Sequence, residues 1–106
     1  MSDERRRAPR YQLIADAEIV ELRSNAKLNA RTSDVSLVGC FMNSARSFPQ
    51  GSKVWLCLVL KKKSFTSLGV IVRTQPTGMA VSFSEVKKDQ HNELHRWLAQ
   101  IGRAAL

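Results

Sequence analysis

The residues from Leu13 to Phe83 alternate short apolar runs with turn residues, and this pattern limits the fold more than any other feature of the chain. Six such runs can be counted, and their composition is typical of strands rather than helices. Strands this close together cannot pair in parallel, because parallel connections need long crossovers. An antiparallel sheet of this size hides its edges and apolar faces best by closing on itself. We therefore expect an all-β fold, a six-stranded antiparallel β-barrel over residues 13–84.

Two of the six runs carry more specific predictions. LIADAEIVEL (13–22) departs from strict alternation, which predicts a bulge. VWLCLVL (54–60) is continuously apolar, which predicts a strand buried on both faces, with Trp55 in the core. The three lysines at 61–63 then form the solvated tip of a hairpin, or alternatively a contact for nucleic-acid phosphates. The other four runs are KLNARTSDVS (27–36), GCFMNS (39–44), SFTSLGVIVRT (64–74) and GMAVSF (78–83).

The sequence after Phe83 changes from strand-like to helical. It contains good helix formers and repeats apolar residues at spacings of three and four. We expect a helix over residues 87–102 that packs one apolar stripe on the barrel, with Gly102 as its C-terminal cap. That stripe consists of Leu94, Trp97, Leu98 and Ile101.

Size and charge limit the partners. A chain of 106 residues is one domain by length, and hydrophobic and charged fractions of 43% and 25% are ordinary for a folded protein. The net charge of +8 favours anionic partners such as nucleotides, nucleic acids or anionic membrane surfaces. No apolar run is long enough to span a bilayer and the N-terminus lacks a secretory apolar segment, so we expect a cytoplasmic protein without membrane insertion.

The candidates for metal or catalytic chemistry favour ordinary structural roles. Cys40 and Cys57 have no CxxC spacing, so we interpret them as reduced, buried thiols. His91 and His95 stand four apart, but HNELH does not place the glutamate directly after the first histidine, as a metalloprotease helix requires. No nucleophile, carboxylate pair or phosphate-binding glycine loop is evident in the sequence, so we expect a non-enzymatic protein without metal or cofactor.

Two short motifs carry the functional signal. The first is the RxxxR of Arg6 to Arg10, preceded by a further arginine, Arg5. The second is the DxSxxG of 34–39, at the junction of the second and third expected strands. With the GVIVR…GMAVSF hairpin and the closing helix, this pair resembles the PilZ domain family over nearly the whole chain. One departure is Ala80, which stands where the family's hairpin often has a second glycine.

The resemblance implies a receptor for the second messenger cyclic di-GMP. It assigns the ligand to Arg5, Arg6, Arg10, Asp34, Ser36 and Gly39, and more loosely to Arg7 and Arg73. Arginine suits phosphates and guanines alike, because its planar guanidinium can fork onto phosphate oxygens, donate to guanine O6 and N7, or stack on a base. A carboxylate such as that of Asp34 can accept from the guanine N1 and N2 donors, the Ser36 hydroxyl can meet a base edge or a phosphate, and Gly39 permits a backbone angle or a close approach.

Some of these assignments stay open. Arg73 either lies beside the nucleotide or simply faces outward from its strand, and Arg5 would reach a second ligand molecule only if an intercalated dimer binds.

We expect residues 1–12 to form a flexible arginine-rich loop that the ligand orders, changing the surface shown to a protein partner. Two alternatives remain, a small basic barrel that binds single-stranded nucleic acid and a PilZ adaptor that acts without the messenger. For the loop alone, a disordered basic tail is the simplest interpretation.

Overall fold

The computed structural model describes residues 8–104, which form seven strands and one helix. Each expected strand run is found at its expected place. The elements are β1 (Tyr11–Gln12), β2 (Asp16–Glu21), β3 (Lys27–Val35), β4 (Gly39–Asn43), β5 (Lys53–Leu60), β6 (Lys63–Gln75), β7 (Gly78–Ser84) and α2 (Lys88–Ala104).

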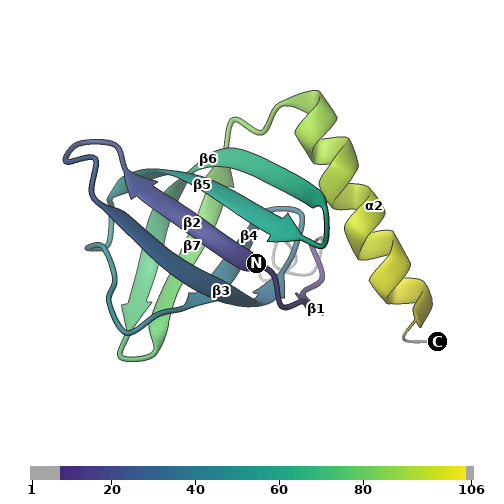
Figure 1. Cartoon of the computed structure of the whole chain (residues 1–106), viewed down its shortest axis with the longest axis horizontal. Helices are drawn as coiled ribbons and strands as arrows, with labels where there is room; N and C mark the ends of the chain where they lie inside the picture. Colours follow the sequence, from purple (N-terminus) through teal and green to yellow (C-terminus); the bar gives the residue numbers. More distant parts are fainter. Residues whose placement is uncertain (1–7, 105–106) are drawn as a thin grey trace, which may run out of the picture.

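The strands form one antiparallel sheet in the order β1-β3-β2-β5-β6-β7-β4. A further pairing between β3 and β4 joins the two sides of this sheet, so β2 to β7 close into the expected six-stranded barrel (Figure 1). The short β1 is an extra strand that continues β2 along β3. The expected loop over residues 1–12 is therefore wrong at its end, because Tyr11 and Gln12 pair with Val35 and Asp34 of β3. Closure leaves the six barrel strands without a free edge, as a small antiparallel sheet requires.

The core lies inside the barrel and follows the two-residue period of the strands. On β5, Val54, Leu56 and Leu58 are fully buried and alternate with partly exposed neighbours. Phe65 and Ile71 do the same on β6. Barrel closure and one apolar face per strand therefore account for the fold.

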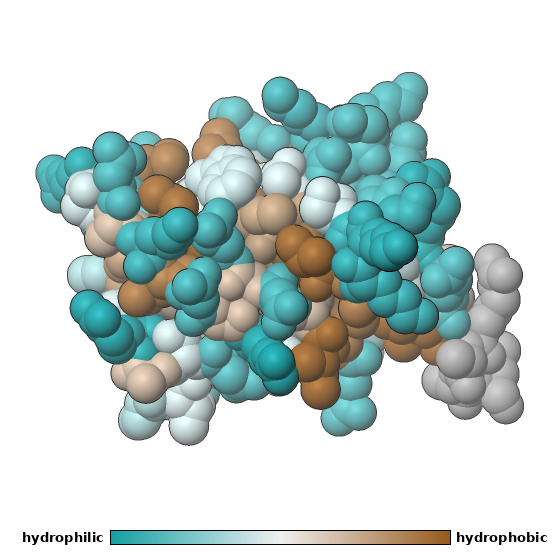
Figure 2. Space-filling model, viewed as in Figure 1, coloured by the Kyte–Doolittle hydropathy of each residue, from teal (hydrophilic) through white to brown (hydrophobic). Residues whose placement is uncertain are grey.

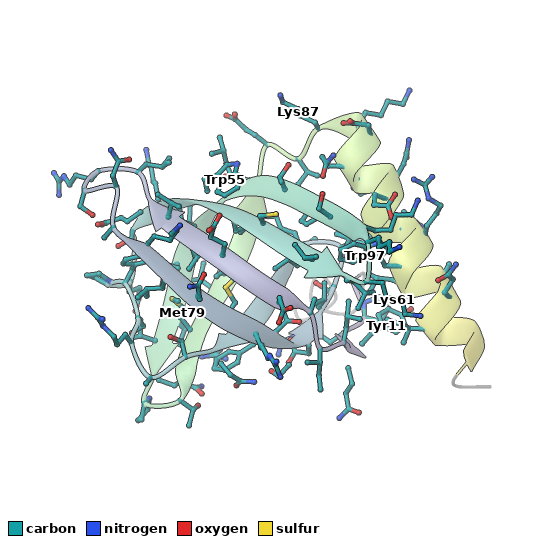
Figure 3. The ribbon with its side chains drawn as sticks, in the orientation of Figure 1. Tyr11, Trp55, Lys61, Met79, Lys87 and Trp97 are labelled. Atoms are coloured by element: carbon teal, nitrogen blue, oxygen red, sulfur yellow. The ribbon has the colours of Figure 1, made fainter. Side chains whose placement is uncertain are left out.

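The prediction that β5 is buried on both faces was wrong. Trp55 is only partly buried and Val59 is 39% exposed, and both lie on the outer face of the strand. Figure 3 shows Trp55 outside the barrel, and Figure 2 shows apolar side chains exposed among hydrophilic ones on the same side of the molecule. The run is continuously apolar because both faces carry apolar residues, although only the inner face is enclosed.

The hairpin and the first strand agree with the sequence. The predicted lysine hairpin tip is confirmed, since Leu60 pairs with Lys63 across a two-residue turn in which Lys61 has a φ of 58°. The expected irregularity in the first run is also present. The chain leaves the ladder between β1 and β2, at residues 13–15.

Helix α2 packs across one end of the barrel, where it contacts β6 and β1 (Figures 1 and 3). Leu94, Trp97 and Leu98 are buried as expected. The side-chain oxygen Oε1 of Gln90 accepts a 2.7 Å hydrogen bond from the amide of Thr66, which ties the start of the helix to β6. The prediction that Gly102 ends the helix was wrong, because the helix continues to Ala104. No helix within residues 8–104 has the length and apolarity to cross a membrane.

Candidate functional site

The two sequence motifs meet on the outside of the barrel, around a pocket of about 490 Å³. Arg10 enters it from the segment before β1, Asp34 from β3, Ser36 from the turn between β3 and β4, and Gly39 from the start of β4. Arg5, Arg6 and Arg7 lie outside the described residues. We call this hollow the motif pocket; it is lined by Ala8, Pro9, Arg10, Asp34, Ser36, Val38, Gly39, Cys40, Phe41, Val72, Arg73, Ala80, Val81 and Ser82.

The Ser36 hydroxyl is built into the turn between β3 and β4. Its Oγ accepts hydrogen bonds from the amides of Val38 at 3.1 Å and Gly39 at 3.2 Å, and donates to the Gly39 carbonyl at 3.3 Å. The residue is only 4% exposed. A hydroxyl that donates and accepts within one turn fixes the shape of that turn. Ser36 therefore shapes one wall of the motif pocket.

Gly39 is required by a close approach of two strands. A Cβ at this position would overlap the Val81 carbonyl oxygen of β7 and lie 3.3 Å from the Ser82 Cα. Its amide and carbonyl also hold the Ser36 turn. The glycine thus lets β4 and β7 lie close together directly beneath the pocket.

Among residues 8–104, the charges that line the motif pocket are two guanidiniums and one carboxylate, those of Arg10, Arg73 and Asp34. Cys40 adds no charge, because burial raises the pKa of its thiol well above the usual range, and the nearby negative charge of Asp34 raises it further. Asp34 is half-buried and lies opposite Gln12 of β1. The pocket therefore combines cationic donors for an anion with one carboxylate acceptor.

Two bulges lie beside the motif pocket. Between β3 and β4 the register shifts between Thr32 and Asp34, which adds one residue to β3. Between β6 and β7 it shifts between Ile71 and Arg73, which adds one residue to β6. A bulge turns consecutive residues toward one side of the sheet. The second bulge accounts for Val72 and Arg73 lining the same pocket.

Sequence reasoning missed the apolar side of the pocket. Val38 and Val72 both line it and are 59% and 48% exposed. One signal was available, since Val38 is an apolar residue at a variable position of DxSxxG. Val72 had no such signal, because its orientation depends on the bulge.

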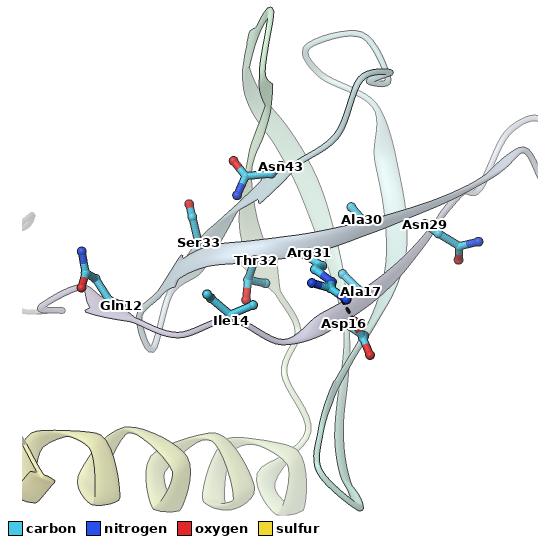
Figure 4. Close-up of a pocket in the computed structure, with 10 residues that line it drawn as sticks. All are labelled: Gln12, Ile14, Asp16, Ala17, Asn29, Ala30, Arg31, Thr32, Ser33 and Asn43. Atoms are coloured by element: carbon cyan, nitrogen blue, oxygen red, sulfur yellow. Dashed lines mark ion pairs between the residues drawn. The ribbon is translucent and has the colours of Figure 1, made fainter.

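A larger hollow of about 950 Å³ lies on the outside of β1, β2 and β3 (Figure 4). Its charged residues, Asp16 and Arg31, pair with each other at 3.3 Å. Its other polar lining is neutral, and includes Gln12 and Asn43. We call it the β2–β3 groove. Although the groove is larger, it suits an anion less well than the motif pocket, because Arg31 is already paired with a carboxylate.

Comparison with known proteins agrees with this arrangement. Residues 4–100 match the PilZ domain family. The chain belongs to this family. Both motifs of the PilZ pattern and all of the barrel strands fall within the matched residues.

Three solved structures share the fold, and two of them are described as PilZ domains. The PilZ domain of YcgR from Escherichia coli with cyclic di-GMP is 17% identical, with a TM-score of 0.75 and 95% of this chain and 94% of that chain covered. The PilZ domain of CeSA from a cellulose-synthesizing bacterium is 14% identical, with a TM-score of 0.71 and 89% and 98% covered. The Bacillus subtilis inhibitor of motility MotI/DgrA is 17% identical, with a TM-score of 0.73; the match covers 88% of this chain and 49% of that chain. None of the curated proteins matches the sequence.

The departure from the PilZ hairpin pattern lies at the pocket wall. Gly78 is needed, because a Cβ there would overlap the Met42 carbonyl oxygen of β4. Ala80, at the departing position, is 9% exposed and lines the motif pocket. The change therefore adds one methyl group to this wall.

The remaining candidate residues lie away from the pocket or form no cluster. The rings of His91 and His95 lie edge-on with centroids 5.5 Å apart on α2, and within residues 8–104 no three potential metal ligands gather. Cys40 and Cys57 are both free, but Cys57 is half-buried rather than buried as expected.

Proposed function

We propose that this PilZ domain is a receptor for cyclic di-GMP and that the ligand lies in the motif pocket. The observation that carries the proposal is the convergence of Arg10 with Asp34, Ser36 and Gly39 around one hollow, although more than twenty residues separate the two motifs in sequence. A solved relative of the same fold, the YcgR domain, was determined with this ligand.

The chemistry of the pocket suits a ligand with two phosphates and two guanines. In this proposal Arg10 forks onto a phosphate or a guanine edge, joined by Arg5 and Arg6 and more loosely by Arg7. Asp34 accepts from guanine N1 and N2. Arg73 lies beside a base and can stack on it.

Shape and apolar surface complete the site. Ser36 and Gly39 contribute through the turn and the close strand approach described above, with the serine hydroxyl at the pocket wall. Val38 and Val72 offer exposed methyl groups to the faces of the purines, which bury apolar surface when they bind.

The output of the receptor is an altered surface for a protein partner rather than catalysis. Residues 8–12 already have a fixed place, with Tyr11 and Gln12 paired to β3, so ligand binding orders only the arginines before Ala8 over the pocket. These arginines, the Ser36 turn and the ligand then form one composite face. Ordering a segment on ligand binding is an established switching device.

Isothermal titration calorimetry with cyclic di-GMP tests the proposal. The variants are Arg6→Ala/Arg10→Ala and a matched control, Arg23→Ala/Arg46→Ala, which removes the same charge from exposed positions outside the motif pocket. Hydrogen bonds to charged groups contribute about 1.5–3 kcal/mol each, so losing both arginines should weaken binding by at least ~100-fold. Binding should survive in the control variant and in excess GTP.

Other outcomes would contradict the receptor and favour one of the two alternative functions. Absence of heat with a folded wild-type protein contradicts the receptor and leaves the adaptor. Tight, strongly salt-dependent binding of a single-stranded oligonucleotide, equally weakened in both double variants, identifies a nucleic-acid-binding barrel instead.

A further inference from the structure

We infer that the Thr32 hydroxyl is the latch that fixes the register of residues 8–15, here called the arm, and thereby positions Arg10 at the motif pocket. The inference rests on the proposed function in so far as Arg10 binds the ligand. Thr32 itself does not line the motif pocket, so it acts through the arm.

The register between the chain and β3 shifts by one residue along the arm. Gln12 of β1 pairs with Asp34, and Asp16 of β2 pairs with Arg31. From Gln12 to Asp16 the chain advances four residues, while from Asp34 to Arg31 the facing strand β3 advances only three. The arm therefore carries one extra residue, and residues 13–15 cannot complete a regular ladder with β3.

Thr32 supplies three of the four hydrogen bonds between residues 13–15 and β3; the fourth runs from the Leu13 amide to the Ser33 carbonyl at 3.3 Å. Its Oγ1 donates to the Leu13 carbonyl at 2.6 Å and accepts from the Ala15 amide at 2.9 Å, while its own amide donates to the Ala15 carbonyl at 3.0 Å. Thr32 is 1% exposed, so these bonds are screened from water. Figure 4 shows Thr32 across from the arm at Ile14. A hydroxyl is suited to this task because one atom both donates and accepts.

The extra residue sets which side chains of the arm reach the motif pocket. With it in place, Tyr11 lies opposite Val35 and Gln12 opposite Asp34, and Arg10 follows at the pocket. A slip of one residue would turn each side chain of a strand to the opposite face. Arg10 would then point toward the barrel interior, and its guanidinium would be lost to the ligand.

Apolar contacts hold the arm to the barrel but do not account for its register alone. Leu13 and Ala15 are 7% and 2% exposed and belong to the core. Ala8 is also buried. Apolar burial has no preferred direction and so tolerates a shift of the arm along β3, whereas hydrogen bonds depend on direction and do not tolerate it. Without the hydroxyl, the Leu13 carbonyl and the Ala15 amide lose their partner, so the arm should open locally.

The test compares Thr32→Val, which keeps the shape and loses the hydroxyl, with Thr32→Ser, which keeps the hydroxyl. Ser67→Ala is the matched control, because Ser67 is also buried and its hydroxyl donates to backbone carbonyls of β6 and β7, outside the arm. The readouts are amide hydrogen exchange of Leu13 and Ala15 relative to β5 in the free protein, the urea midpoint, and the affinity for cyclic di-GMP.

Thr32→Val should accelerate exchange in the arm by about tenfold relative to β5, and weaken cyclic di-GMP binding by about tenfold, as the loss of two hydrogen bonds implies. Thr32→Ser should restore both. Ser67→Ala should lower the urea midpoint without selective opening of the arm.

Two results would overturn the inference: arm exchange that rises no more than β5 exchange, or selective arm opening with unchanged affinity. If wild-type protein binds no cyclic di-GMP, the proposed function fails, and arm exchange alone decides whether Thr32 is a latch.

Discussion

Replacing Gly39 by alanine is the substitution for which the structure gives the most direct cost. The new Cβ would overlap the Val81 carbonyl oxygen, which belongs to the backbone and cannot rotate away. Strands β4 and β7 would have to separate, and overpacking of this kind costs about 1–3 kcal/mol. Gly69→Ala is a graded comparison, because its Cβ would approach less closely, at 2.9 Å from the Ser82 carbonyl oxygen and 2.9 Å from the Val81 Cγ1.

Urea unfolding measures the difference. We expect Gly39→Ala to lose ~2–3 kcal/mol, at the upper end of the overpacking range, and Gly69→Ala about 1 kcal/mol. With a slope of roughly 1–3 kcal/mol per molar urea, the Gly39→Ala midpoint should fall by about 0.7–3 M. Cyclic di-GMP binding should weaken as well, because the strand that moves carries the pocket wall. A midpoint shift no larger than that of Gly69→Ala would refute the close-approach argument.

Three further predictions concern single side chains. Ser36→Ala should lose about 1–2 kcal/mol in urea unfolding and weaken ligand binding, whereas Ser44→Ala, which removes one exposed hydrogen bond, should change neither; equal effects would contradict the turn role. A thiol reagent at neutral pH should modify half-buried Cys57 first and buried Cys40 only as the protein unfolds; modification of both together would argue against this burial. The hydrogen bond from Arg96 lowers the pKa of Glu93, so this bond stabilises the fold fully above the ordinary glutamate pKa, and the stabilisation is lost as the pH falls through the lowered pKa of Glu93. Glu93→Gln should therefore reduce the urea midpoint more at pH 7 than at about pH 3, and a difference that does not change with pH would contradict this reasoning.

The sequence predicted the strands and the helix because local periodicity determines both. Alternation placed the strands, and the spacing of Leu94, Trp97 and Leu98 placed the buried face of α2. Burial of the outer face is different, since it depends on what covers a strand. Nothing in VWLCLVL tells whether Trp55 meets another layer, and within the described residues it is only partly covered.

The arrangement of the site was predictable in part. Both motifs could be paired by resemblance, and Arg10, Asp34 and Gly39 do line one pocket. The bulges that turn Arg73 and Val72 toward it could not be predicted, because register is set between strands distant in sequence.

Hydrogen-bond partners were likewise beyond the sequence. The residue type of Ser36 fits a ligand contact and a turn equally well, and only the fold brings its hydroxyl to the turn amides. Thr32 offered no signal at all, because its role depends on one extra residue in the arm opposite it.

The measurement that tests the central claim most directly is a titration of the labelled protein with cyclic di-GMP, followed by amide ¹H–¹⁵N correlation spectra. The claim is that the ligand occupies the motif pocket rather than the larger β2–β3 groove. It predicts saturable shifts that concentrate at Arg10, Asp34, Gly39 and Arg73, which line the pocket. Shifts centred instead on the groove, at residues such as Asn29, or no shifts at all, would contradict it.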